Sequence, residues 1–100
     1  MSHSYTLHQI SLAEQRIVSL LKDKNKEGFE LLYDTYSKSL YILSWHLAGN
    51  SSMAEQVMEN TFIYIWKNID SFLPARSSFG VWLVCIVKGE AIKLINSTKS

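Results

Sequence analysis

The sequence predicts an all-α fold, a compact bundle of about four helices, and three observations favour it. The chain has 100 residues, of which 47% are apolar and 12% aromatic, which suits one domain with a single core. It holds only four glycines and one proline, too few for a fold of many tight turns. Its apolar residues recur at steps of three and four, which is the period of an amphipathic helix.

The first helix is expected from Ser11 to about Lys22, because "SLAE" at 11–14 has the form of a capping box. In this motif the serine hydroxyl accepts from the amide of the glutamate, and the glutamate side chain reaches back to the serine amide. The expected apolar side of this helix is Leu12, Ile17, Leu20 and Leu21.

A second, longer helix is expected within "NKEGFELLYDTYSKSLYILSWHLAGN". At about 1.5 Å per residue, its roughly 22 residues would span about 33 Å. Gly49 and Asn50 are expected to end it, since both residue types adopt the left-handed backbone that stops helices. The expected apolar stripe is Phe29, Leu32, Tyr33, Tyr36, Leu40, Leu43 and Leu47.

A third helix is expected from a second capping box, "SMAE" at 52–55, to about Ile69. The spacing predicts that one side of this helix faces the core and the opposite side faces solvent. The inward side is Val57, Met58, Thr61, Phe62, Ile65, Trp66 and Ile69. The outward side is Gln56, Glu59, Asn60, Ile63 and Lys67.

The stretch "SFLPARSSFGVWL" at 71–83 predicts a joint followed by a fourth helix. Ser77 or Ser78 would cap this helix, which would run to about Ile95. Its segment "VWLVCIV" could also form a buried strand, but the chain holds no second strand of that type, so a helix is favoured.

The amino-terminal stretch and the single cysteine indicate a cytoplasmic protein. Residues 1–16 lack the basic start and apolar stretch of a signal peptide, and no apolar run approaches the ~20 residues of a membrane span. Cys85 excludes a disulfide framework, and its place in "VWLVCIV" predicts a buried, inert thiol. We expect no membrane insertion.

No motif for catalysis or for a cofactor is found. His3, His8 and His46 do not combine with cysteines or carboxylates at the spacing of a metal site. The chain has no glycine-rich phosphate loop and no nucleophile elbow. We therefore expect neither an enzyme nor a cofactor.

The last third of the chain is basic, which favours a polyanionic partner there. Its charged residues are Arg76, Lys88, Lys93 and Lys99 against Glu90 alone. An ordinary solvated surface explains the same small excess equally well.

Three stretches carry a resemblance to a known family: "EGFELLYDTYSKSLY" at 27–41, "AEQVMENTFIYIWKNIDSF" at 54–72 and "ARSSFGVWLVCIVKGEAI" at 75–92. Their order, separations and aromatic placements resemble region 2 of bacterial RNA polymerase sigma factors, of the extracytoplasmic-function (ECF) type in the sigma-70 family. The resemblance covers residues 10–97. We expect 1–9 to be a flexible N-terminus and 98–100 to start a linker, with the domain that reads the minus-thirty-five element absent from this chain.

The resemblance implies a helical domain that docks on core RNA polymerase and binds and melts the minus-ten promoter element during transcription initiation. The polymerase contact, with the clamp helices of the largest subunit, falls on Gln56, Glu59, Asn60 and Ile63. The contact with the non-template strand falls on the joint and the fourth helix, at Asp70, Ser71, Arg76, Ser77, Ser78, Phe79, Trp82, Lys88 and Lys93.

Unpaired bases need donors and a stacking wall, which the serine hydroxyls, Arg76 and the two aromatic residues of this list could supply. The alternative for Phe79 and Trp82 is a place in the core, because both fit the inward stripe of the fourth helix.

Two departures from the family pattern keep a second hypothesis open. The family commonly has Asp, Gln and an acid where this chain has Gln56, Glu59 and Asn60, and its fourth helix often carries more arginine. The alternative is a diverged, sigma-like interaction module that has lost DNA binding and binds another protein, for example an anti-sigma factor.

Overall fold

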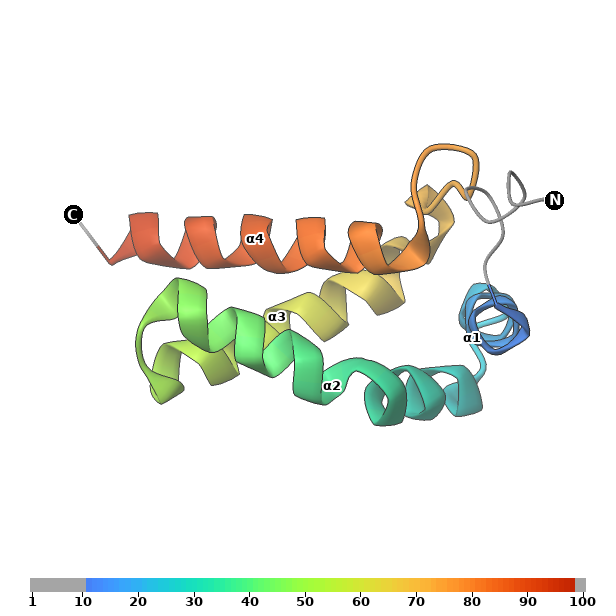
Figure 1. Ribbon diagram of the computed structural model, residues 1–100, viewed down its shortest axis with the longest axis horizontal. Coiled ribbons are helices and arrows are strands. Elements are labelled where there is room, and N and C mark those ends of the chain that lie inside the picture. The colour runs from blue at the N-terminus through green and yellow to red at the C-terminus, as the bar shows by residue number, and fades with distance from the viewer. Residues whose placement is uncertain (1–10, 99–100) are drawn as a thin grey trace, which may run out of the picture.

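The structure, a computed structural model, describes residues 11–98 and confirms the all-α prediction (Figure 1). Its elements are α1 (Leu12–Lys22), α2 (Lys26–Ala48), α3 (Ser51–Asn68), the short 3-10 helix η2 (Ile69–Ser71) and α4 (Phe79–Ser97). Among the described residues, no helix combines the length and the apolar character needed to cross a membrane. The segment expected to be flexible at 1–9, with His3 and His8, lies outside the described residues, as do residues 99–100.

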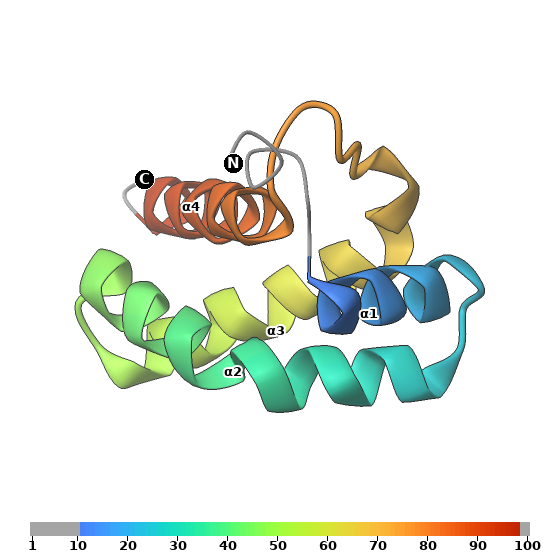
Figure 2. The same cartoon turned by 45° about the vertical axis from the view of Figure 1, so that its right-hand side comes forward.

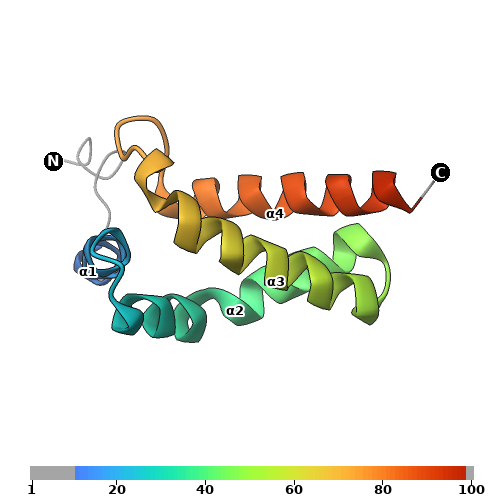
Figure 3. The same cartoon turned by 180° about the vertical axis from the view of Figure 1, so that it is seen from behind.

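The long helix α2 is the centre of the bundle, because α1, α3 and α4 all pack against it. Figure 2 shows α1 lying over the N-terminal half of α2. Seen from behind, α3 crosses in front of α2 and α4 (Figure 3). The molecule measures 50 × 31 × 22 Å along its principal axes.

The core draws residues from every element. Burying one such large apolar side chain contributes about 1.5–3 kcal/mol. The large core residues with no exposed surface are Leu21, Leu32, Val57, Ile65, Ile69, Phe72, Phe79, Leu83 and Val87.

Three predicted helix ends are confirmed. Ser11 caps α1 in a capping box, where its Oγ accepts from the Glu14 amide at 3.1 Å and the Glu14 Oε1 accepts from the Ser11 amide at 3.2 Å. Gly49 ends α2 with a left-handed φ of 87°. Ser78 caps α4, because its Oγ accepts from the Val81 amide at 3.2 Å.

The predicted capping box at 52–55 is wrong. Asn50 caps α3 instead, since its Oδ1 accepts from the Met53 amide at 2.8 Å, and the helix begins at Ser51. Asn50 follows the left-handed Gly49, has extended backbone and carries a side-chain acceptor, so it fulfils the cap requirement before the chain reaches Ser52.

The burial predictions for Leu12 and Cys85 are also wrong. Leu12 is 82% exposed, because five residues at about 100° each rotate it roughly 140° away from Ile17. Val18 takes its place in the core. Cys85 is exposed rather than buried, since α4 directs Phe79, Leu83 and Val87 inward, which places position 85 on the outer side.

Candidate functional site

The outward side of α3 forms a polar ridge, as predicted. We use the name α3 ridge for Gln56, Glu59, Asn60 and Ile63. Gln56 and Glu59 are exposed, Asn60 is partly exposed, and Ile63 is 47% exposed. The opposite side of α3 supplies the buried Val57, Thr61 and Ile65, so packing leaves the ridge free for a partner.

A groove of about 1010 Å³ runs between α2 and α3 along one flank of this ridge. Glu59 and Ile63 belong to its α3 wall, whereas Gln56 and Asn60 do not line it. We call it the α2–α3 groove. Its lining is mainly apolar and aromatic: Lys26, Phe29, Tyr33, Ser37, Lys38, Tyr41, Glu55, Met58, Glu59, Phe62, Ile63, Trp66 and Lys67.

Aromatic rings form a continuous row in the groove. Tyr33 packs against Phe62 with 5.3 Å between ring centroids, and Phe62 meets Phe29 edge-on at 5.7 Å. Phe29 in turn meets Trp66 edge-on at 5.8 Å. The sequence predicts Tyr33 on the apolar stripe of this helix, but it is 51% exposed and forms part of the α2 wall of the groove. Such a row offers a large, rigid contact surface for a partner's apolar side chains.

The two ends of the groove differ in charge. Because α2 and α3 run in opposite directions from Gly49 and cross, the start of α2 and the end of α3 lie at the same end of the molecule (Figure 3). Lys26 and Lys67 therefore mark one end, and Glu55 and Glu59 mark the other end with Lys38 opposite them on α2. A partner would meet an apolar floor between charged ends, which favours one orientation of docking.

The predicted joint is an exposed loop, residues 73–78, whose two ends are buried in the core. Phe72 and Phe79 have no exposed surface, and their ring centroids lie 5.2 Å apart. The Leu73 carbonyl accepts from the Arg76 amide at 2.8 Å, which closes a tight turn at the start of the loop. The loop (orange in Figure 1) rises above the joint of α3 and α4.

The structure distributes the predicted DNA-binding residues of the joint unequally. Arg76 is exposed, and it has no acidic partner within residues 11–98. Ser77 is partly exposed. Ser71 and Ser78 are exposed but each already has a bond: Ser71 Oγ donates to the Asn68 carbonyl at 2.7 Å, and Ser78 caps α4. Asp70 is exposed in η2.

The structure corrects the expected contact of Phe79 with a DNA base. Its ring is wholly buried against Phe72, Trp82 and Tyr36, so it has no surface to offer to a base in this conformation. Phe79 instead belongs to the core, which was the alternative interpretation. Trp82 is partly exposed.

Trp82 and Lys93 line a small hollow of about 270 Å³ on α4. Lys93 Nζ forms an ion pair with Glu90 at 3.0 Å, so part of its charge is compensated. Lys88 is exposed on α4, four residues before the exposed Ile92, and unlike Cys85 and Lys93 it does not line this hollow. The cations of α4 are therefore divided between two sides of the helix.

The described part of the chain holds no group of three or more histidine, cysteine or acidic side chains that could bind a metal ion. His46 lies exposed near the end of α2.

Comparison with known proteins identifies the family. The family model for Sigma-70 region 2 matches residues 32–100, and the chain belongs to this family. It is 31% identical over 67 residues to the ECF RNA polymerase sigma factor SigX of Bacillus subtilis, a match that covers 67% of this chain and 34% of SigX. It is 29% identical over 82 residues to SigW of the same organism, also an ECF RNA polymerase sigma factor, covering 82% of this chain and 43% of SigW.

A further relative is the ECF RNA polymerase sigma factor BldN of Streptomyces coelicolor, 32% identical over 62 residues, which cover 62% of this chain and 24% of BldN. The chain thus spans less than half the length of each of these relatives. All three matches are sigma factors, so they do not favour the alternative of a diverged interaction module.

Proposed function

We propose that the chain is the promoter-recognition domain of an ECF sigma factor, which docks on core RNA polymerase and binds the minus-ten element as the duplex opens. The role is one of binding, and it needs no cofactor and no catalytic group from this domain. It would be carried out in the cytoplasm. The family membership of residues 32–100 supports this role.

The observation that carries the docking half of the proposal is the exposed Ile63–Glu59 wall of the α2–α3 groove. Ile63 is an aliphatic side chain that is 47% exposed beside a carboxylate and above a row of aromatic rings. Interfaces concentrate their binding energy in such apolar sites surrounded by polar groups. We propose that this wall contacts the clamp helices of the polymerase. Gln56 and Asn60, on the side of the α3 ridge away from the groove, would contact the same helices.

The promoter half rests on the 73–78 loop. Arg76 supplies a free cation for a phosphate or for stacking on a base, and Ser77 supplies a hydroxyl. With Phe79 buried, the partly exposed ring of Trp82 is the aromatic surface that α4 offers to a base of the non-template strand. Because few cations are free, the domain alone should bind DNA weakly, and it should gain most of its affinity once it is docked on the polymerase.

The test is co-purification followed by DNA binding. A tagged 100-residue chain is mixed with bacterial core RNA polymerase, and the complex is then titrated with a labelled fork DNA whose minus-ten non-template strand is unpaired. The proposal expects a complex that binds this DNA far better than the chain alone does. Failure of the chain to bind the polymerase would overturn the proposal. Binding to polymerase without any gain in DNA binding would support the interaction-module alternative instead, with an anti-sigma factor as a further candidate partner.

A further inference from the structure

The turn between α1 and α2 places a lysine where a glycine would be expected. The Asn25 amide donates to the Leu20 carbonyl at 2.9 Å and the Lys24 amide donates to the Leu21 carbonyl at 2.9 Å. These two bonds define a Schellman motif, in which the residue at the Lys24 position takes left-handed backbone. Lys24 has a φ of 58°, and within residues 11–98 it is the one residue other than glycine whose φ is positive.

A side chain at such a position strains the backbone, and glycine would avoid this cost. A strained residue is retained where its side chain makes contacts that outweigh the strain, and such residues gather at functional sites. The side chain of Lys24 makes two contacts with one residue that lies 42 positions away. Its Nζ donates to the Trp66 carbonyl and stands over the Trp66 ring, 5.2 Å from the centroid.

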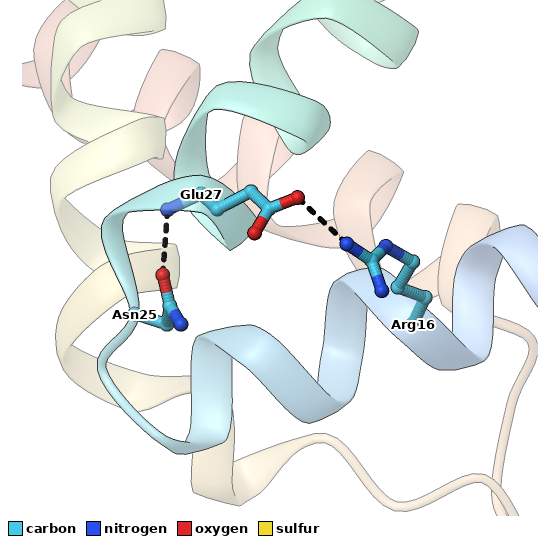
Figure 4. A network of polar contacts seen from close by, with 3 residues as sticks. All are labelled: Arg16, Asn25 and Glu27. Atoms are coloured by element: carbon cyan, nitrogen blue, oxygen red, sulfur yellow. Dashed lines mark hydrogen bonds and ion pairs between the residues drawn. The ribbon is translucent and has the colours of Figure 1, made fainter.

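The surroundings hold the Lys24 backbone in place on both sides. Figure 4 shows Asn25 in the turn, Glu27 at the start of α2 and Arg16 on α1. The Asn25 Oδ1 accepts from the Glu27 amide at 2.9 Å, and the Glu27 carboxylate pairs with Arg16 at 2.6 Å. These contacts link the start of α2 to α1 across the turn, and from this turn the Lys24 side chain reaches Trp66 on α3.

Trp66 links this turn to the α2–α3 groove. It lines the groove and ends the aromatic row through its edge-on contact with Phe29. It also lies in the last turn of α3, where carbonyl groups lack amide partners from a following turn. A cation at this end of a helix interacts favourably with its dipole. Lys24 therefore binds both the backbone and the ring of the residue that ends the aromatic row.

We propose that Lys24 is a positioning residue for the α2–α3 groove: it holds Trp66 and the end of α3 in the arrangement that the polymerase meets. The inference rests on the proposed function, since it concerns the same docking surface. Lys24 precedes residues 32–100, the part matched by the family model, whereas its partner Trp66 lies within that part.

The test compares Lys24→Gly and Lys24→Asn with Lys24→Arg. Glycine and asparagine both accept left-handed backbone, so they remove the contacts to Trp66 and relieve strain at the same time. We expect their melting temperatures to stay close to that of the unchanged chain, while their affinity for core polymerase falls about threefold to tenfold. Lys24→Arg retains a cation and should retain most of the affinity.

Lys22→Asn is the matched control, because it removes the same charge from an exposed position two residues away. It should leave affinity unchanged. A second readout follows the indole N–H resonance of Trp66, assigned by its loss in Trp66→Phe. This resonance should move in Lys24→Gly and Lys24→Asn, and it should not move in Lys22→Asn.

Each outcome bears on the inference. Unchanged affinity of Lys24→Gly, with the Trp66 resonance in place, would overturn the positioning role while the proposed function stands. A large drop in melting temperature that accompanies the lost affinity would show that Lys24 is merely structural. If the unchanged chain itself does not bind core polymerase, the proposed function fails, and the positioning role fails with it.

Discussion

Phe72 and Phe79 meet across the base of the 73–78 loop, with ring centroids 5.2 Å apart and no exposed surface on either residue. Phe72 follows η2 and Phe79 opens α4, so the pair fixes both ends of the loop to the core. The exposed loop residues, Arg76 among them, are thereby held at a constant place on the surface although they make few contacts of their own.

This pairing predicts that Phe79→Ala destabilises the fold by about 3–5 kcal/mol, because it removes a wholly buried ring and leaves a cavity. Urea denaturation measures the loss. Val81→Ala, two residues further on and 54% exposed, is the control and should change the free energy of unfolding by less than about 0.5 kcal/mol. A Phe79→Ala chain as stable as the control would show that the ring is not part of the core.

Arg76 should serve promoter opening and not folding. Since it is exposed and has no acidic partner among the described residues, Arg76→Ala should leave the melting temperature within about 2 °C. With core polymerase, open-complex formation should fall about fivefold, which corresponds to about 1 kcal/mol. Lys22→Ala is the charge-matched control. A fall of several degrees in melting temperature would assign Arg76 a structural role instead.

The Tyr36–Glu14 contact predicts a dependence of stability on alkaline pH. Burial, then the hydrogen bond to Glu14 at 2.6 Å and its negative charge, raise the pKa of Tyr36 above its ordinary value. The unfolded chain loses the phenolic proton first, near pH 10, so the contribution of Tyr36 is complete below pH ~10 and decreases as the pH rises above it.

Tyr36→Phe should therefore lower the free energy of unfolding by about 1 kcal/mol at pH 7. Between pH 9 and pH 11, the free energy of unfolding of this variant should decrease less steeply than that of the unchanged chain. Parallel urea titrations at these pH values give the comparison. Identical slopes for the two chains would contradict a raised pKa for Tyr36.

Replacement by alanine should change the stability of the fold in opposite directions at Gly28 and Gly89. A Cβ at Gly28 would lie 2.6 Å from the Leu20 Cβ, so Gly28→Ala should cost about 2–3 kcal/mol by forcing α1 and α2 apart. Gly89 has open space around it in the middle of α4, and Gly89→Ala should stabilise the fold by about 0.5–1 kcal/mol through helix propensity. Thermal unfolding distinguishes the two, and equal effects of both substitutions would contradict the packing described here.

Local signals in the sequence were sufficient to predict most of the fold. Ser11 with Glu14, Gly49 and Ser78 each act through bonds or backbone within a few residues, and all three mark helix ends in the structure. The capping box at 52–55 failed because a competing cap, Asn50, comes first along the chain. The prediction that Cys85 is buried failed because α4 is apolar on several sides, so the sequence pattern could not separate the buried side of this helix from its exposed side.

The candidate site was predicted in part for similar reasons. The α3 ridge follows from the period of one helix, and the structure leaves it exposed. The α2–α3 groove and the contact between Lys24 and Trp66 join segments far apart in the sequence, and no local pattern encodes them. Phe79 fitted both the core and the DNA contact by its position in the sequence, and only the packing of Phe72 against it decides between them.

The most direct test of docking through the α2–α3 groove compares two isoleucines of similar exposure. Ile63 lies on the wall of the groove and is 47% exposed, whereas Ile42 lies on α2 outside the groove and is 51% exposed. Both are changed to aspartate, and the affinity of each chain for core RNA polymerase is measured by equilibrium titration. We expect Ile63→Asp to bind at least tenfold more weakly, about 1.4 kcal/mol, and Ile42→Asp to bind as the unchanged chain does. Equal affinity of the two variants would contradict docking through this groove.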